Sequence, residues 1–96
     1  MIRINAFFQI NEGATEQFLA VVNPLVAASQ AEAGCIAYDL FASTSRPDVY
    51  IMCETWADAA AVEAHNASAH FTAAHPLLGE VCSVVKVESF DMDNKL

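Results

Sequence analysis

The sequence predicts an α+β fold in which four strands and two helical connections follow the order βαββαβ. Two changes of hydrophobic period support this prediction. Residues 2–10 alternate between apolar and mixed positions, as a strand does, and residues 14–33 then repeat apolar side chains at helical spacing. The same change recurs after residue 56, where a β-branched and aromatic run gives way to an alanine-rich segment. This order is the split βαβ, or ferredoxin-like, arrangement with a four-stranded antiparallel sheet.

The first half of the chain supplies one strand and one helix, separated by a turn at residues 11–13 (N-E-G). Thr15 is the expected N-cap of the helix and Gly34 its expected C-cap. Pro24 removes one intrahelical hydrogen bond, so we expect a kink there. The apolar stripe of this helix is expected to consist of Phe18, Val22, Leu25, Val26 and Ser29.

A hairpin follows, because residues 35–42 and 49–56 both alternate as strands and a polar loop joins them. Asp58 is expected to cap the next helix, since its carboxylate can accept free N–H groups of the first turn. Asn66 and Ser68 favour a break in that helix.

Beyond this break, the helix is expected to restart near Ser68 and to be disrupted at Pro76. Residues 81–90 alternate again and form the expected last strand. The chain shows no repeat, linker or low-complexity segment, so residues 1–96 are expected to form a single domain.

Composition excludes several classes of partner. The formal net charge is −8 with only four Lys and Arg, which argues against nucleic acid and against anionic membrane surfaces. No apolar run is long enough to span a bilayer. Three cysteines without paired spacing do not form a disulfide framework, and residues 1–5 lack the features of a signal peptide. We therefore expect a cytoplasmic protein.

Apolar side chains occupy both faces of the predicted sheet. Met52 and Trp56 share one face of their strand, whereas Ile51 lies on the other, together with Phe7 and Phe41 of neighbouring strands. Two helical connections can cover only one of these faces. The second face needs a cover, and the most economical one is the same sheet of a second copy. The sequence therefore predicts a homodimer that forms through the sheet face.

Three segments carry a family resemblance: residues 32–38 (E-A-G-C-I-A-Y), 54–56 (E-T-W) and 65–71 (H-N-A-S-A-H-F). In this order and spacing the chain resembles, over nearly its whole length, the antibiotic biosynthesis monooxygenase family of dimeric α+β barrels. The resemblance implies a pocket between sheet and helices. Some family members oxygenate quinols or polyketide aromatics with O₂ and without metal or flavin. Others isomerise small phosphorylated dicarbonyls, and others degrade haem.

His65 and Tyr38 are the catalytic candidates. His65 matches the recurrent His of the family, and a neutral imidazole can take a proton from an acidic phenol. The alternative is a partly buried His that ties the helix end to the sheet. Tyr38 could donate a hydrogen bond to a substrate carbonyl or a developing oxyanion, or it could be a core residue.

Trp56, Glu54, Phe71 and His70 are the candidate substrate-binding residues. Trp56 could form a flat wall for an aromatic ring, or anchor the core where strand turns into helix. Glu54 could act as a base or orient His65; alternatively, backbone donors or a cation such as Arg3 satisfy it, with Lys86 an equivalent cation. Phe71 is expected in the core and His70 at the pocket mouth.

No metal site and no cofactor are expected. His65, His70 and His75 are spaced by five residues, so on one helix each step rotates by ~140° and the three do not share a face. A break near Asn66 could change this geometry. No metal-binding spacing such as HxxxH is present. Haem is disfavoured because the haem-degrading branch uses a Trp at about the position of His65.

Together, these observations favour a cofactor-independent monooxygenase acting on a quinol or an aromatic polyketide-like molecule. In this hypothesis His65 is the base or anion stabiliser, Tyr38 and Trp56 orient a planar substrate, and molecular oxygen is the second substrate. The alternatives are an isomerase of a small dicarbonyl metabolite, which would use the same base without O₂, and a non-catalytic dimeric module that binds a hydrophobic small molecule.

Overall fold

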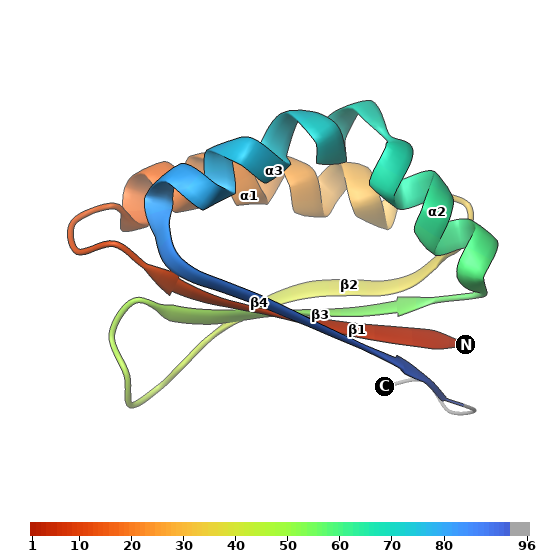
Figure 1. The fold of residues 1–96 in the computed structure, drawn as a ribbon, viewed down its shortest axis with the longest axis horizontal. Helices are drawn as coiled ribbons and strands as arrows, with labels where there is room; N and C mark the ends of the chain where they lie inside the picture. Colours follow the sequence, from red (N-terminus) through yellow and green to blue (C-terminus); the bar gives the residue numbers. More distant parts are fainter. Residues whose placement is uncertain (93–96) are drawn as a thin grey trace.

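The structure is a computed structural model that describes residues 1–92, and its elements follow the predicted order (Figure 1). The second helical connection consists of two helices, with the predicted break at Ser68 between them. The elements are β1 (Ile2–Ile10), α1 (Thr15–Gln30), β2 (Cys35–Ala42), β3 (Val49–Trp56), α2 (Ala59–Ala67), α3 (Ala69–Val81) and β4 (Cys82–Asp91).

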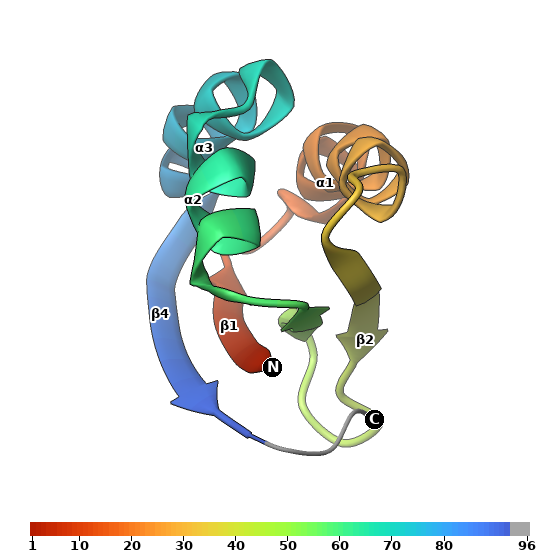
Figure 2. The same cartoon turned by 90° about the vertical axis from the view of Figure 1, so that its right-hand side faces the viewer.

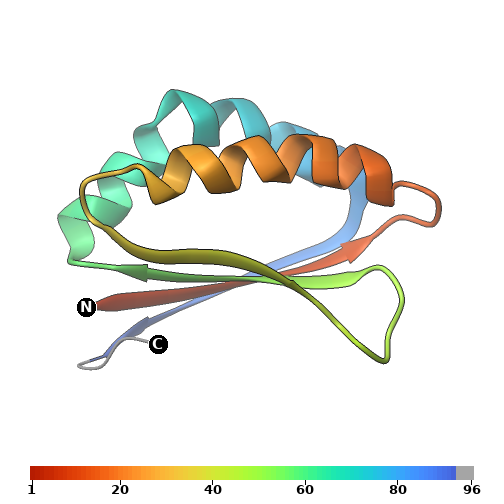
Figure 3. The ribbon, with the colours of Figure 1, turned by 180° about the vertical axis from the view of Figure 1, so that it is seen from behind.

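The strands form one four-stranded sheet in the order β2-β3-β1-β4. β1 pairs antiparallel with β3 and with β4, and β2 pairs antiparallel with β3. All three helices lie on one face of this sheet, with α1 above the β2 side and α3 above the β4 side (Figure 2). The opposite face carries no helix of the described residues (Figure 3). The predicted ferredoxin-like arrangement is confirmed.

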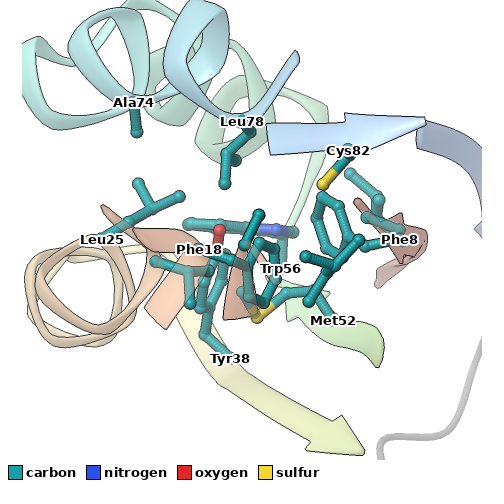
Figure 4. Close-up of a cluster of buried hydrophobic side chains, with 14 residues drawn as sticks. Phe8, Phe18, Leu25, Tyr38, Met52, Trp56, Ala74, Leu78 and Cys82 are labelled. Atoms are coloured by element: carbon teal, nitrogen blue, oxygen red, sulfur yellow. The ribbon is translucent and has the colours of Figure 1, made fainter. Parts of the chain in front are cut away.

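The core lies between the helices and the covered face of the sheet (Figure 4). Alternate residues of β1 point into it, as its period of two requires. Phe18, Leu25 and Leu78 enter from the helices and meet Phe8 and Trp56 of the sheet; the rings of Phe8 and Phe18 are 5.2 Å apart. Burying each such large side chain contributes about 1.5–3 kcal/mol to folding.

β4 is the least covered strand. After Cys82 every residue of β4 is exposed, even though half of its side chains face the helices. Val85 and Val87 are the inward-facing apolar residues, and they are respectively 44% and 63% exposed. The space between β4 and α3 is therefore open toward solvent.

Two of the predicted helix caps are wrong. The N-cap of α1 is Ala14, and the Thr15 hydroxyl instead donates to Oδ1 of Asp48 at 2.7 Å, which ties the helix start to the hairpin loop. The C-cap is Ala31, three residues before Gly34. Gly34 is needed for another reason. A Cβ there would overlap the Cβ of Ala61, so glycine permits close packing of this loop against α2.

Both helices that contain proline continue through it. The expected disruption at Pro76 is wrong, because α3 runs from Ala69 to Val81. Pro76 is exposed, while Ala74 and Leu78 on either side of it are buried in the core. Because the residues on both sides of Pro76 pack in the core, the helix continues although one backbone hydrogen bond is lost. α1 likewise spans Pro24.

Two findings bear on the expected cellular environment. None of the described helices combines the length and the apolar composition that crossing a membrane requires. Cys35, Cys53 and Cys82 are all free thiols.

Candidate active site

A cavity of about 330 Å³ lies between the covered face of the sheet and helices α2 and α3. This volume is at the small end of the range for small-molecule sites. Its walls are mainly apolar, and Val85 and Val87 of β4 line its open side. The polar residues that line it are Tyr38, Glu54, His65, Asn66 and His75. The cavity therefore suits a small, largely apolar molecule with a few polar groups.

His65 is held firmly in the last turn of α2. Its side chain is only 2% exposed, and its ring packs against Trp56 at 4.6 Å and Phe71 at 5.0 Å between centroids. The helix ends two residues later, where Ser68 adopts an extended conformation and caps the start of α3 through the N–H of Phe71. Asp58 caps the start of α2 as predicted, by accepting from the N–H of Ala61.

The break at Ser68 brings His65 and His70 together. Both rings contact the same carboxylate oxygen, Oε2 of Glu32: Nδ1 of His65 at 2.6 Å and Nε2 of His70 at 2.9 Å. The predicted break near Asn66 and Ser68 is confirmed. It changes the geometry expected for one continuous helix, since His65 lies on α2 and His70 on α3.

The contact with Glu32 sets the protonation pattern of His65. An ionised carboxylate only accepts hydrogen bonds. Nδ1 of His65 therefore carries the ring proton and donates a hydrogen bond to Oε2 of Glu32. In the neutral ring Nε2 is then an acceptor, and it has no hydrogen-bond partner among the described residues. Since His65 lines the cavity, this nitrogen is available to a bound molecule.

Glu54 is the second titratable group of the cavity wall. It lies on the inner face of β3, is 6% exposed, and accepts a hydrogen bond from Nε1 of Trp56 at 2.9 Å. Burial raises its pKa to about 7; the Trp56 N–H opposes this rise and the Glu32 carboxylate adds to it. The expected partners Arg3 and Lys86 are wrong, because both occupy outer-face positions of their strands.

Tyr38 completes the polar wall from β2. It is buried, lies edge-on to Trp56 at 6.1 Å, and its ring centroid is 5.5 Å from that of His65. Burial, and next the nearby Glu54 carboxylate, raise the pKa of the Tyr38 hydroxyl above its ordinary value. The neighbouring Ser29 hydroxyl opposes part of this rise, and Tyr38 remains a phenol at neutral pH.

The structure separates the predicted site residues into two groups. Tyr38, Glu54, His65 and Phe71 line the cavity. Trp56 is fully buried behind them and is not among the lining residues. His70 also lies outside the cavity wall, in contact with Glu32.

Glu32 is the functional candidate that sequence reasoning missed. It lies in the turn after α1, where its N–H donates to the Ser29 carbonyl and its own carbonyl accepts from Cys35. Its partners His65 and His70 are 33 and 38 residues away. The sequence signal that could have pointed to Glu32 is its position at the start of the E-A-G segment. The glycine of this segment allows the turn to pack closely against α2.

An antiparallel ferredoxin-like sheet with helices on one face, and an apolar cavity between them that bears a buried histidine, define the class of small α+β proteins to which the chain belongs. Within this class the chain belongs to the antibiotic biosynthesis monooxygenase family, whose model matches residues 1–77.

Similar proteins support this assignment. The Bacillus subtilis (strain 168) protein described as "Putative monooxygenase YcnE" is 38% identical over 71 residues, which cover 74% of this chain and 75% of that protein. A structure from Bacteroides thetaiotaomicron, described as "Possible Oxidoreductase", is 40% identical with a TM-score of 0.89, covering 95% of this chain and 96% of that one. A crystal structure of an antibiotic biosynthesis monooxygenase is 30% identical with a TM-score of 0.90, covering 98% and 100%.

Proposed function

We propose that the protein is a cofactor-independent monooxygenase that acts on a quinol or an aromatic polyketide-like small molecule. The observation that carries this proposal is the free acceptor nitrogen of His65. Its Nδ1 is committed to Glu32, so its Nε2 is a basic atom of a largely apolar wall. Membership of a monooxygenase family supports the reaction class.

The proposed reaction begins with proton transfer from the substrate to Nε2 of His65. Glu32 stabilises the imidazolium that forms, since its carboxylate already accepts the Nδ1 proton. The resulting substrate anion donates an electron to O₂, and the two radicals combine at carbon. For an anthrone-like CH₂ group, one oxygen atom becomes the new carbonyl oxygen. The other oxygen atom leaves as water with the two hydrogens of that carbon.

The surrounding residues have supporting roles in this proposal. The Tyr38 hydroxyl donates a hydrogen bond to the developing oxyanion, which its raised pKa allows at neutral pH. Trp56 and Phe71 fix the His65 ring between them. The largely apolar walls present few proton donors to the substrate anion, which favours its reaction with O₂.

The test is O₂ consumption with a panel of hydroquinones and anthrone-like phenols in metal-free buffer. The wild-type protein should consume O₂ only when a substrate is present, and His65→Ala should slow this uptake strongly. Glu63→Ala is the matched control, because Glu63 is exposed on the same helix. Uptake that is unchanged in His65→Ala would remove His65 from the mechanism, and no uptake across the panel would favour a non-catalytic binding module.

Isomerisation of a small dicarbonyl metabolite is the second candidate, and Glu54 is the observation that favours it. With a pKa of about 7, Glu54 can both accept and donate a proton at neutral pH, and it shares the cavity wall with His65. The net charge of −8 counts against a phosphorylated substrate. Turnover under strictly anaerobic conditions would select this reaction over oxygenation.

We further propose that the protein is a homodimer formed through the outer face of the sheet. Phe7, Ile51 and Phe41 lie side by side there across three strands. Phe41 is 48% exposed, and the Nε of Arg3 is buried on the same face without a partner among the described residues. Phe41→Asp should shift the mass in solution from dimer to monomer, whereas a monomeric wild type would contradict the proposal. The predicted cytoplasmic location stays a prediction.

A further inference from the structure

Glu32, His65 and His70 form a compact group of metal-ligating side chains next to the cavity. One ligand atom from each residue can be chosen so that all three lie within 4.8 Å of one another. The three residues come from three different parts of the fold: the turn after α1, the end of α2 and the start of α3. We infer that these three side chains form a binding site for a divalent transition-metal cation of the Zn²⁺ class.

The donor set matches the chemistry of such cations. Two imidazole nitrogens and one carboxylate oxygen are a common protein ligand set for Zn²⁺ and its neighbours, with a solvent molecule in the remaining position. Magnesium and calcium prefer all-oxygen ligands, so the two histidines discriminate against them. Glu32 makes no ion pair with a Lys or Arg of residues 1–92, so its charge remains available to a cation.

The three ligands are already positioned. His65 is held between Trp56 and Phe71, and the backbone of Glu32 is fixed by its hydrogen bonds to Ser29 and Cys35. The present contacts of 2.6 and 2.9 Å are hydrogen-bond distances. Tetrahedral Zn²⁺ places its ligand atoms roughly 3.3 Å apart, so the two contacts of Glu32 with the histidines must each lengthen by about half an ångström. The ring of His70 can move, because it lies on the more open side.

Solvent can reach the site from that side. His70 is 27% exposed and Glu32 is 16% exposed, whereas His65 is almost completely buried. A cation would therefore enter beside His70, bind between the two helices, and keep its remaining coordination positions toward solvent. It would lie at Nδ1 of His65, on the other edge of the ring from Nε2.

Metal binding has a consequence for the cavity, and this step rests on the proposed function. A neutral imidazole that binds a cation through Nδ1 carries its proton on Nε2. Nε2 then donates a hydrogen bond and can no longer accept a proton from the substrate. Zn²⁺ is therefore expected to bind to the protein and to stop the base-dependent reaction, without entering the cavity.

The binding test needs no substrate. Metal-free protein is titrated with Zn²⁺ in a calorimeter, and we expect one Zn²⁺ per chain together with a higher Tm. Glu32→Gln and His70→Gln should each weaken Zn²⁺ binding by at least roughly 10–100-fold. This is the loss in affinity that follows when a residue that only supports a metal ligand is changed. His70→Gln is informative because glutamine can still donate a hydrogen bond to Glu32. His75→Ala is the control, since His75 is outside the three-residue group, and it should bind Zn²⁺ like the wild type.

Co²⁺ distinguishes this site from binding by the three free thiols. Occupation of the histidine–glutamate site should give visible bands without the near-ultraviolet charge-transfer band of a cobalt–thiolate bond. A thiolate band, no Zn²⁺ binding, or equal affinity in His70→Gln would overturn the site. If Zn²⁺ binds as expected but O₂ uptake in an active assay is unaffected, the proposed block of His65 is wrong while the site stands.

Discussion

Oε2 of Glu32 lies 2.6 Å from Nδ1 of His65. This contact joins a turn residue after α1 to the buried end of α2, and it leaves Nε2 of His65 as a basic atom of the cavity wall. Both the protonation pattern of the histidine and its fixed orientation follow from this one carboxylate. The first prediction therefore concerns Glu32.

Glu32→Gln should lower the rate of O₂ uptake roughly 10–100-fold, as the loss of a partner that orients a functional histidine typically does. The amide carries no charge to stabilise the imidazolium. The free energy of unfolding should also fall by about 1–3 kcal/mol, because the Nδ1 proton of His65 loses a charged acceptor in a buried position. Steady-state kinetics and urea unfolding measure the two effects. Glu12→Gln, an exposed carboxylate elsewhere, is the control; equal rates in both variants would contradict the role of Glu32.

The buried carboxyl of Glu54 should make the free energy of unfolding depend on pH. This carboxyl has an ordinary pKa of 4.5, and burial raises this value to about 7 in the folded protein. As the pH rises above 4.5, the unfolded chain ionises first, so the free energy of unfolding falls until about pH 7 and is then constant. The full loss is roughly 3 kcal/mol.

Glu54→Gln removes this titration and keeps an acceptor for the Trp56 N–H. Urea unfolding of both proteins across this pH window should therefore show a stability decline in the wild type that is absent from the variant. Parallel curves for the two proteins would mean that Glu54 is ionised throughout, and the environment assigned to it here would be wrong.

A larger side chain at position 34 should destabilise the protein by a steric clash with α2. Its Cβ position overlaps Ala61, so Gly34→Ala should lower the free energy of unfolding by about 1–3 kcal/mol and move the Glu32 turn away from α2. Adding Ala61→Gly should restore part of this loss, as a double-mutant cycle would measure. Gly79→Ala is the control: nothing lies within 4 Å of its Cβ position on α3, so it should be stabilising by about 0.5–1 kcal/mol. Full tolerance of Gly34→Ala would contradict the close packing.

The Ser68 hydroxyl should stabilise the break between α2 and α3. It donates to the His65 carbonyl at 2.6 Å and accepts from the Phe71 N–H. Ser68→Ala should cost about 1 kcal/mol of stability and speed amide hydrogen exchange at Phe71. Thr72→Ala provides the comparison, since the Thr72 hydroxyl contacts only backbone carbonyls on the exposed side of α3. If Phe71 exchanges at the same rate in both variants, Ser68 does not hold the junction.

The fold could be predicted from the sequence because its signals are local. Alternation in β1, the hairpin pattern of β2 and β3, and the capping residues Asp58 and Ser68 each act within a few positions of the chain. The errors arose where packing overrides local preference. Helix α3 continues through Pro76 because the buried residues on either side of it hold it in place.

The candidate site could be predicted only in part. His65, Tyr38 and Glu54 were visible as polar or aromatic residues in an otherwise apolar context. Glu32 was not, because only the folded chain brings it within hydrogen-bond distance of residues 33 and 38 positions away. The hydrogen bond from Trp56 to Glu54 was missed for a different reason, although the two residues are only two positions apart. It joins two residues of the same strand face that were treated as separate candidates.

The rate of O₂ uptake by His65→Gln tests most directly whether Nε2 of His65 accepts the substrate proton. Glutamine can still donate to Glu32 but has no basic nitrogen, so the variant separates the chemical role of His65 from its structural one. With a substrate that the wild type oxidises, the rate should fall by at least ~100-fold while Tm stays close to that of the wild type. Uptake at the wild-type rate by the folded variant would contradict this role of His65.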